Sequence, residues 1–401
     1  MPAFISFLLL LLFLPTQLGK HFFLPFSFIS GVRVDYLAPA IYLTDIFALA
    51  TIIFNIKLLK SLITPKTILI FALFAIPTLF AFSPLLAGYK LLKIAEIILV
   101  FWIAYKSKLA PHFVLGAIFA GSVFEAVLAC LQFVYKGSLQ GIFYWFGERY
   151  LTLSTPDIAK ASFNSIEILR PYATFSHPNS MAGFYLLIYI FILIYKPFLK
   201  FPILRAATLF FCSVLIVLSC SKTAILCYIF FTIIYVIKTK LYEHCTFCFI
   251  SRILTISILG GIFLFAQGDP TSLAKRLYLI QNAGTLIVSH PFFGVGPGNY
   301  LVAQSVFSMP YLFFFSQPVH NIYLLYFAEM GVLVGGIALF LIFKNNRARL
   351  KSFELAMILG VIGVTGMVDH YWLTLQQNML LAPIVFGVVL QRYGALKRDK
   401  E

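Results

Sequence analysis

The chain has 401 residues, of which 61% are hydrophobic and only 11% are charged, and its formal net charge is +16. With a mean hydropathy of +0.96 it has too little polar surface for a soluble domain, so the composition predicts an all-α polytopic membrane protein. Apolar stretches long enough to cross about 30 Å of hydrocarbon predict about twelve transmembrane helices. They lie near 3–19, 39–56, 66–84, 88–105, 111–135, 178–195, 202–219, 222–237, 250–267, 319–343, 353–368 and 378–391.

The basic residues predict the orientation of these spans. If the N-terminus is cytoplasmic and successive spans alternate, roughly nineteen of the thirty Lys and Arg residues fall in short inner loops. The positive charge is therefore a topology signal, and we expect no nucleic-acid partner, because the basic residues are scattered over separate loops. The first stretch could instead be a signal peptide, but it has neither a charged n-region nor a small-residue cleavage site.

This topology divides the chain into three parts. Residues 1–267 are expected to hold nine spans, with an outer loop near 136–177. Residues 268–319 are expected to form a large extracytoplasmic loop containing short helices, and residues 320–401 the last three spans and a basic cytoplasmic tail. The two long polar stretches then lie outside the cytoplasm.

Ionisable residues occur early in the predicted bundle. Asp45 enters the second span, either as a satisfied polar group or as part of a site. Lys90, Lys93 and Glu96 share one face of the fourth span, where an internal ion pair with snorkelling side chains is favoured over substrate contact.

The first long outer segment ends in RPYATFSHPNSMAGFYLL. Thr174 or Ser176 can cap the sixth span, and Pro178 fits its first turn. Three polar side chains then gather at this helix N-terminus: Arg170, His177 and Asn179. Lys222 stands at the start of the eighth span, and His320 at the start of the tenth. Helix N-termini beside cationic side chains suit a phosphate or diphosphate.

The second outer stretch opens with a predicted amphipathic helix. Asp269 reads as its N-cap and Pro270 as its first residue, and His290-Pro291 ends it. Its apolar residues are expected at Leu273, Leu277, Ile280, Gly284 and Ile287, and it carries Lys275 and Arg276. The following GVGPG run is weak as a phosphate loop, because no strand precedes it; backbone turning explains its glycines equally well.

The tenth span begins with His320 and Asn321 and carries Glu329. Asn321 and Glu329 are expected on one helical face, with Glu329 about two turns deep, where it orients a neighbour inside the bundle. Each candidate also has a plainer interpretation: the arginines as solvated loop residues, Lys222 as a snorkelling side chain, His320 as a backbone-bonded residue.

The cysteines predict no disulfide framework, because none lies in the long outer segments. His244, Cys245 and Cys248 form at most half a zinc site without a second ligand pair, so we expect neither a metal nor another cofactor.

Four stretches of the chain resemble the O-antigen ligase and O-antigen polymerase family of bacterial membrane glycosyltransferases. They are RPYATFSHPN at 170–179, SKTA at 221–224, the helix with Arg276 followed by HPFFGVGPGNY at 290–300, and HNIYLLYFAEMG at 320–331. The resemblance implies about a dozen spans, a GT-C-type fold and a large periplasmic loop between two late spans. It also implies a glycan donor carried by undecaprenyl diphosphate, with Arg276 contacting the diphosphate and His320 activating or positioning an acceptor hydroxyl. Family members commonly carry arginine where this chain has Lys222, which keeps the charge but loses the bidentate fork.

The residues then favour an inverting, metal-independent transfer of a glycan to an acceptor on a glycan, lipid or protein. Fixed cations can stabilise the departing diphosphate, and a neutral His320 can take the proton of the attacking hydroxyl. A polysaccharide polymerase that uses the same donor is the first alternative. A transporter or flippase of lipid-linked sugars is the second, and a noncatalytic scaffold in an envelope assembly is the third.

Overall fold

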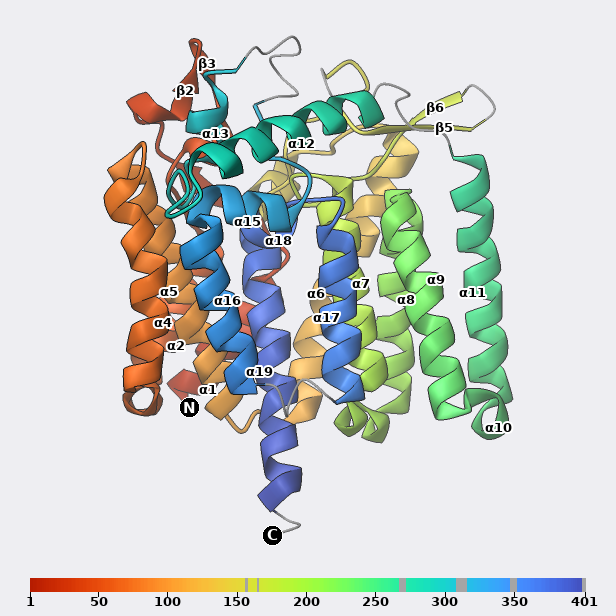
Figure 1. Cartoon of the computed structure of the whole chain (residues 1–401). Coiled ribbons are helices and arrows are strands. Elements are labelled where there is room, and N and C mark those ends of the chain that lie inside the picture. The colour runs from red at the N-terminus through yellow and green to blue at the C-terminus, as the bar shows by residue number, and fades with distance from the viewer. Residues whose placement is uncertain (156–157, 164–165, 267–271, 308–315, 347–351, 399–401) are drawn as a thin grey trace.

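The computed structural model describes residues 1–155, 158–163, 166–266, 272–307, 316–346 and 352–398. Long helices stand side by side in one bundle, with both chain termini toward one end (Figure 1). The helix α12 (Ser272–Ser289) lies across the opposite end, which we call the outer end (Figure 1).

Each predicted apolar stretch contains a helix. In chain order these helices are α1 (Pro2–Phe13), α2 (Leu43–Phe54), α4 (Pro65–Ala75), α5 (Pro84–Lys106), α6 (Pro111–Tyr135), α7 (Pro178–Ile194), α8 (Pro202–Ser219), α9 (Lys222–Thr239), α11 (Thr246–Phe265), α15 (Ile322–Met330) with α16 (Val332–Asn346), α17 (Phe353–Gly366) and α19 (Gln376–Arg398). Shorter helices connect them: α3 (Ile56–Leu59), α10 (Leu241–His244), α13 (Tyr300–Gln304) and α18 (Tyr371–Thr374). Many of the long helices start with proline, whose fixed φ and missing N–H suit the first helical position.

Within the described residues, four helices are long and apolar enough to cross a membrane: α6, α8, α9 and α11. Two bent helix pairs raise that number to six if each pair counts as one span. The helices α1, α2, α7 and α17 are apolar but shorter. The chain is thus an α-helical integral membrane protein, whereas the count of twelve spans and the GT-C-like arrangement stay predictions.

The predicted span 319–343 is not one continuous helix. It is broken at Gly331 into α15 and α16, and the helix axis bends by 116° at the break. Gly331 has a φ of +74°, a conformation that side chains with a Cβ rarely adopt. Because of this bend, α15 lies beneath α12 at the outer end while α16 runs into the bundle (Figure 1).

Three short antiparallel strand pairs occur in the described part of the chain. The first joins β1 (Gly19–His21) to β4 (Ala40–Tyr42), so the first two spans are shorter than their apolar stretches. The others are β2 (Phe28–Ile29) with β3 (Val32–Arg33) and β5 (Lys160–Phe163) with β6 (Ile166–Leu169). The pairs β2–β3 and β5–β6 lie at the outer end, on opposite sides of it (Figure 1).

Two apolar cores organise the molecule. The larger surrounds α7, which is buried along its whole length, including the rings of Tyr185 and Tyr189. The smaller lies at the outer end and fastens α12 and α15 to the N-terminal outer segment through Leu279, Leu325 and Val34.

The helix α12 ends at Ser289 as predicted, but its buried face differs from the predicted one. The buried residues are Leu279, Asn282, Ala283 and Leu286, whereas Leu273, Leu277 and Ile280 are exposed. The spacing alone did not distinguish the two faces, because apolar residues occur on both. Asp269 and Pro270, predicted to start the helix, lie outside the described residues.

Buried ionisable groups join α2, α5 and α19. The Lys93 ammonium contacts the carboxylates of Asp45 and Glu96, and its Nζ lies 3.6 Å from the Glu96 Oε2. The Gln376 side chain also donates to Asp45. This confirms the internal ion pair predicted for the fourth span, and it shows Asp45 as a satisfied polar group.

A disulfide joins Cys245 and Cys248 at the start of α11. The sequence predicts no disulfide framework, and this single local disulfide is a feature that it does not predict. Because the two sulfurs are joined, they are not half of a zinc site.

Candidate functional site

Arg276 reaches from α12 toward the end of α17. Its Nη1 donates to the Val368 carbonyl at 3.0 Å, which fixes one side of the guanidinium. Its Nε is buried and has no hydrogen-bond partner in the described structure. Since a buried N–H of a charged group is costly when unpaired, this atom marks a place where an acceptor is needed.

The start of α15 brings His320 and Asn321 to the same place. The Asn321 Oδ1 caps the helix by accepting from the backbone N–H groups of Tyr323 and Leu324, at 2.9 and 3.0 Å. The Asn321 Nδ2 donates to the Met367 carbonyl at 3.0 Å, next to the Arg276 contact. His320 directly precedes this cap, so its position follows from the cap.

The start of α7 supplies a third group. Arg170 donates from Nη2 to the Asn179 Oδ1 and from Nε to the Ser219 carbonyl, both at 2.6 Å. Asn179 in turn donates from Nδ2 to Asp369 at 3.1 Å. The His177 Nδ1 accepts from the Asn179 backbone N–H at 3.1 Å.

The cap of α7 is therefore His177, and not Thr174 or Ser176 as predicted. The Thr174 hydroxyl donates to the Pro15 carbonyl at 2.9 Å and also contacts the Glu125 carboxylate. Thr174 therefore serves to hold the loop before α7 against α1 and α6. Pro178 occupies the first turn, as predicted.

Sequence reasoning missed Asp369 and His370, which lie between α17 and α18. Both are buried, with 8% and 3% of their surface exposed. Asp369 accepts from Asn179, and the His370 ring lies 5.1 Å from the His320 ring in an edge-to-face arrangement. The available signal was an Asp-His pair directly after an apolar stretch, at its predicted outer end.

We call these eight residues the outer polar cluster. They are Arg170, His177, Asn179, Arg276, His320, Asn321, Asp369 and His370. The cluster joins the starts of α7 and α15 to α12 and to the turn after α17, which are distant in sequence.

Electrostatics make the imidazoles of this cluster neutral and its carboxylate negative. Burial lowers the pKa of His320 to about 3, and the nearby His370 and Arg276 act in the same direction against the opposing charge of Asp369. Burial likewise lowers the pKa of His177 to about 3, helped by Arg170. At neutral pH both rings can accept a proton.

The pKa of the Asp369 carboxyl is shifted by two opposing effects. Burial alone would raise the pKa of its carboxyl, but Arg276 and, at low pH, the protonated rings of three neighbouring histidines outweigh burial and hold the pKa at about 2. Asp369 is then ionised beside two guanidinium groups, so the cluster carries net positive charge. This balance favours an anionic ligand.

Two predicted site residues lie elsewhere. Lys222 begins α9 but turns its ammonium group toward α11, where Nζ lies 5.6 Å from the centre of the Phe263 ring. Glu329 lies in the last turn of α15, not two turns deep in a span, because the helix ends at Met330. Its carboxylate accepts from the backbone of Gly298 and Tyr300 and lies near Lys90.

The GVGPG run is a structural turn. Gly294, Gly296 and Gly298 have φ values of +65°, +94° and +72°. The Gly296 N–H donates to the Glu329 carbonyl at 3.0 Å, and the Val295 carbonyl accepts from the Phe82 N–H at 3.2 Å. The loop thus ties α15 to the start of α5, which supports backbone turning over phosphate binding.

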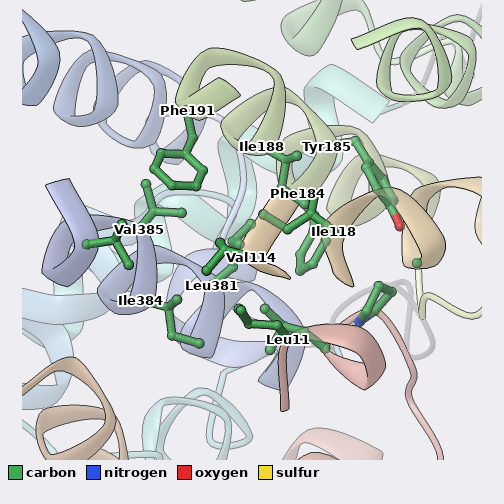
Figure 2. A pocket seen from close by; sticks show the side chains of 14 residues that line it. Leu11, Val114, Ile118, Phe184, Tyr185, Ile188, Phe191, Leu381, Ile384 and Val385 are labelled. Carbon is green, nitrogen blue, oxygen red and sulfur yellow. The ribbon is translucent and has the colours of Figure 1, made fainter. Parts of the chain in front are cut away.

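The cavities inside the bundle are separate from this cluster. Figure 2 shows apolar side chains, among them Leu11, Phe184 and Ile384, around a space of about 20 Å³ between α1, α6, α7 and α19. A larger cavity of about 180 Å³ lies beside it and includes the Glu125 carboxylate. Neither cavity is lined by a residue of the outer polar cluster.

Part of the chain is similar to a known family. Residues 171–340 match the family model described as O-antigen ligase. This stretch of the chain is similar to O-antigen ligases. It runs from the loop before α7 into α16, and it includes His177, Asn179, Arg276 and His320. No curated protein matches the chain.

The family match confirms the resemblance found in the sequence, and it supports an activity of the O-antigen ligase or polymerase type. Asp369 and His370 lie beyond the matched residues, yet they complete the cluster. Among the described residues, no group of three or more His, Cys, Asp and Glu side chains is placed to hold a metal ion.

Proposed function

We propose that this protein transfers a glycan from undecaprenyl diphosphate to an acceptor hydroxyl at the outer face of the bacterial cytoplasmic membrane. The observation that carries the proposal is Arg276, whose buried Nε is available to donate to an anionic group within a positively charged cluster. A diphosphate supplies that acceptor and neutralises the excess charge.

The donor diphosphate would bind between Arg276 and the start of α7. Arg170 contributes charge there, although its Nε and Nη2 already donate to Ser219 and Asn179. The N-termini of α7 and α15 add partial positive charge. Lys222 lies apart from the cluster, so we assign it at most a long-range electrostatic share.

The chemistry would be a single displacement at the anomeric carbon. The acceptor oxygen forms the new bond while the bond to the diphosphate oxygen breaks, which inverts the anomeric configuration. His320 takes the hydroxyl proton, and undecaprenyl diphosphate leaves with the electron pair, stabilised by Arg276. No residue in this scheme requires a metal or a cofactor.

The remaining residues of the outer polar cluster would position His320 and Arg276. Asp369 stabilises the imidazolium that forms on His320, much as a carboxylate supports a catalytic histidine elsewhere. Asn179 holds Asp369, and Asn321 fixes the start of α15. His177 caps α7, and Glu329 supports the other end of α15 from outside the cluster.

Two other functions would use the same donor site. A polysaccharide polymerase differs only in its acceptor, which would be a second lipid-linked glycan. A transporter of lipid-linked sugars would bind the diphosphate without breaking the glycosidic bond.

The test is a transfer assay in proteoliposomes with undecaprenyl-diphosphate glycan as labelled donor. The wild type is compared with His320→Ala and Arg276→Ala, and the labelled glycan is followed by gel. Movement of label to an added acceptor supports a ligase, and lengthening of the lipid-linked glycan supports a polymerase. Intact donor that only changes membrane side would refute transfer and favour transport.

His320→Ala should reduce the rate of transfer by about 10²–10⁴, the usual contribution of a general base. The amount of protein in the membrane should stay unchanged. Wild-type rates in this variant would remove His320 from the mechanism.

A further inference from the structure

A second polar site lies at the outer end, formed by the N-terminal segment. Asp35 is the meeting point of two arginines: its Oδ1 lies 3.6 Å from the Arg33 Nε, and its Oδ2 lies 3.8 Å from the Arg149 Nη2. All three side chains are exposed, with between 45% and 63% of each accessible. We call Arg33, Asp35 and Arg149 the arginine patch.

Aromatic rings border this patch. The Arg33 guanidinium lies 4.7 Å from the centre of the Phe23 ring, and His21 stacks on Phe23 at 6.1 Å. The His21 Nε2 lies 3.3 Å from the Tyr42 hydroxyl. Ring faces beside charged hydrogen-bonding groups are suited to a sugar, which has an apolar face and polar edges.

The patch is continuous with the outer polar cluster through Tyr36. This residue follows Asp35 directly, and its ring lies 5.4 Å from the His370 ring, edge to face. Tyr36 is also within electrostatic range of Asp369 on one side and of Arg149 on the other. A ligand at the patch would therefore extend toward His320, which neighbours His370.

The loop that carries Arg149 is held firmly against the site. Its neighbour Glu148 is buried and accepts from Gln132 at 2.8 Å and from the Leu139 backbone at 2.9 Å. Gln132 in turn accepts from the backbone N–H groups of Tyr172 and Ala173, at 3.0 and 2.7 Å. The buried Gln132 side chain therefore holds both the loop that leads to Arg149 and the stretch that leads to α7.

The charge of the patch indicates what kind of sugar it takes. Two guanidinium groups face one carboxylate, so one positive charge is left without a partner of opposite sign in the patch. Arginine forks fit carboxylate and phosphate groups in bidentate geometry. A neutral sugar would not neutralise that positive charge, whereas an acidic sugar would.

We propose that the arginine patch is the acceptor subsite and binds an acidic sugar, bearing a carboxylate or a phosphate. The proposal rests on the proposed transfer reaction for its role, but the binding itself does not depend on that reaction. Arg33 and Arg149 bind the acidic group, Asp35 orients both arginines, and Tyr36 connects the patch to His370.

The experiment measures sugar binding directly on the full chain in nanodiscs by saturation-transfer NMR. The probes are an oligogalacturonate, a sugar phosphate and a neutral maltooligosaccharide of equal length. The variants are Arg33→Ala with Arg149→Ala, the same pair changed to Lys, and Lys160→Ala as matched control. Lys160 forms an exposed ion pair with Glu167 at 3.0 Å on the β5–β6 hairpin, across the outer end from the patch.

We expect the wild type and Lys160→Ala to bind at least one acidic probe, and the double Ala variant to bind it at least tenfold more weakly. The double Lys variant should recover part of the affinity because it keeps the charge. The proposal is overturned by equal binding of acidic and neutral probes, by equal binding in the double Ala variant, or by no binding in the wild type. If the probes bind in the predicted pattern but the protein transfers no glycan, the proposed function is refuted and the acidic-sugar site is not.

Discussion

At the scale of single residues, the proposed chemistry rests on His320 and Asp369. Burial lowers the pKa of the His320 imidazole, so the ring is neutral at neutral pH, whereas the Asp369 carboxylate stays ionised. In the proposed mechanism His320 is the base that accepts a proton, and Asp369 stabilises the imidazolium that results.

Asp369→Asn tests this division of roles. The change removes the charge that favours protonated His320, while the amide can still pair with Asn179. We expect the transfer rate to fall by about tenfold or more, since one pKa unit is a factor of ten in proton affinity. Donor binding, measured separately on the same variant, should be unchanged or tighter, because the cluster loses a negative charge; a variant with the wild-type rate would contradict the role of Asp369.

The pH profile gives a second test of His320. Its pKa of about 3 lies below the ordinary value of 6.5, so the neutral, active ring persists as the pH falls through 6.5. We expect kcat/KM at low donor concentration, which reports the free enzyme, to stay level from pH 8 to pH 5. An imidazole with an ordinary pKa would lose about tenfold between pH 7.5 and 5.5, and such a loss would contradict the assignment.

The sequence identified most of the cluster because its members stand at predicted helix starts. The sequence groups Arg170, His177 and Asn179 at one helix start, where the structure shows their contacts, and it predicts Arg276 and His320 at the same membrane face. The sequence does not predict Asp369 and His370 as site residues, because they follow the end of a helix and form no helix N-cap pattern that would indicate a site. Lys222 was included because its charge and position are visible in the sequence, whereas the direction of its side chain is not.

At the scale of elements, the glycine turn after α12 holds the C-terminal end of α15, because the N–H groups of Val295 and Gly296 donate to the Ala328 and Glu329 carbonyls. The backbone N–H groups that follow the break at Gly331 find acceptors in a distant part of the chain. Those of Leu333 and Val334 donate to the carbonyls of Pro291 and Phe292, at 3.1 and 3.3 Å. These bonds replace those that a continuous helix would make. An apolar stretch such as 319–343 gives no sign of them, which is why the sequence predicted one span there.

Gly296→Ala should disrupt this arrangement. The added Cβ would lie 2.3 Å from the Ala81 Cβ, and the φ of +94° is unfavourable for alanine. We expect a loss of stability of at least about 1–3 kcal/mol, the cost of a residue held in such a region. Thermal unfolding in detergent, followed by size-exclusion chromatography, would show this as a lower unfolding temperature.

Gly284→Ala is the matched control for that substitution. Gly284 lies within α12, and a Cβ there would meet nothing within 4 Å. Alanine favours a helix over glycine by about 1 kcal/mol, so this variant should unfold at the same or a higher temperature. If both substitutions lower the unfolding temperature equally, the conformation of the glycine turn is not the cause of the lost stability.

At the scale of the whole molecule, one end carries the termini and the other carries the cluster, the arginine patch and α12 (Figure 1). The scattered basic residues predicted this division, because short inner loops retain Lys and Arg. They did not predict how the outer segments fold over the bundle. That depends on contacts such as Tyr36 with His370, between residues more than three hundred positions apart.

The orientation of this molecule in the membrane can be tested with single cysteines. Ser61 lies in the exposed turn before α4, and Ser154 in the exposed outer loop before β5. In a variant whose six native cysteines are replaced and which still transfers glycan, Ser154→Cys should react with a membrane-impermeant maleimide in intact spheroplasts. Ser61→Cys should react only after the membrane is opened, because positively charged loops stay inside. Labelling of Ser61→Cys alone in intact spheroplasts would place the cluster in the cytoplasm, where it would meet the donor before export and not afterwards.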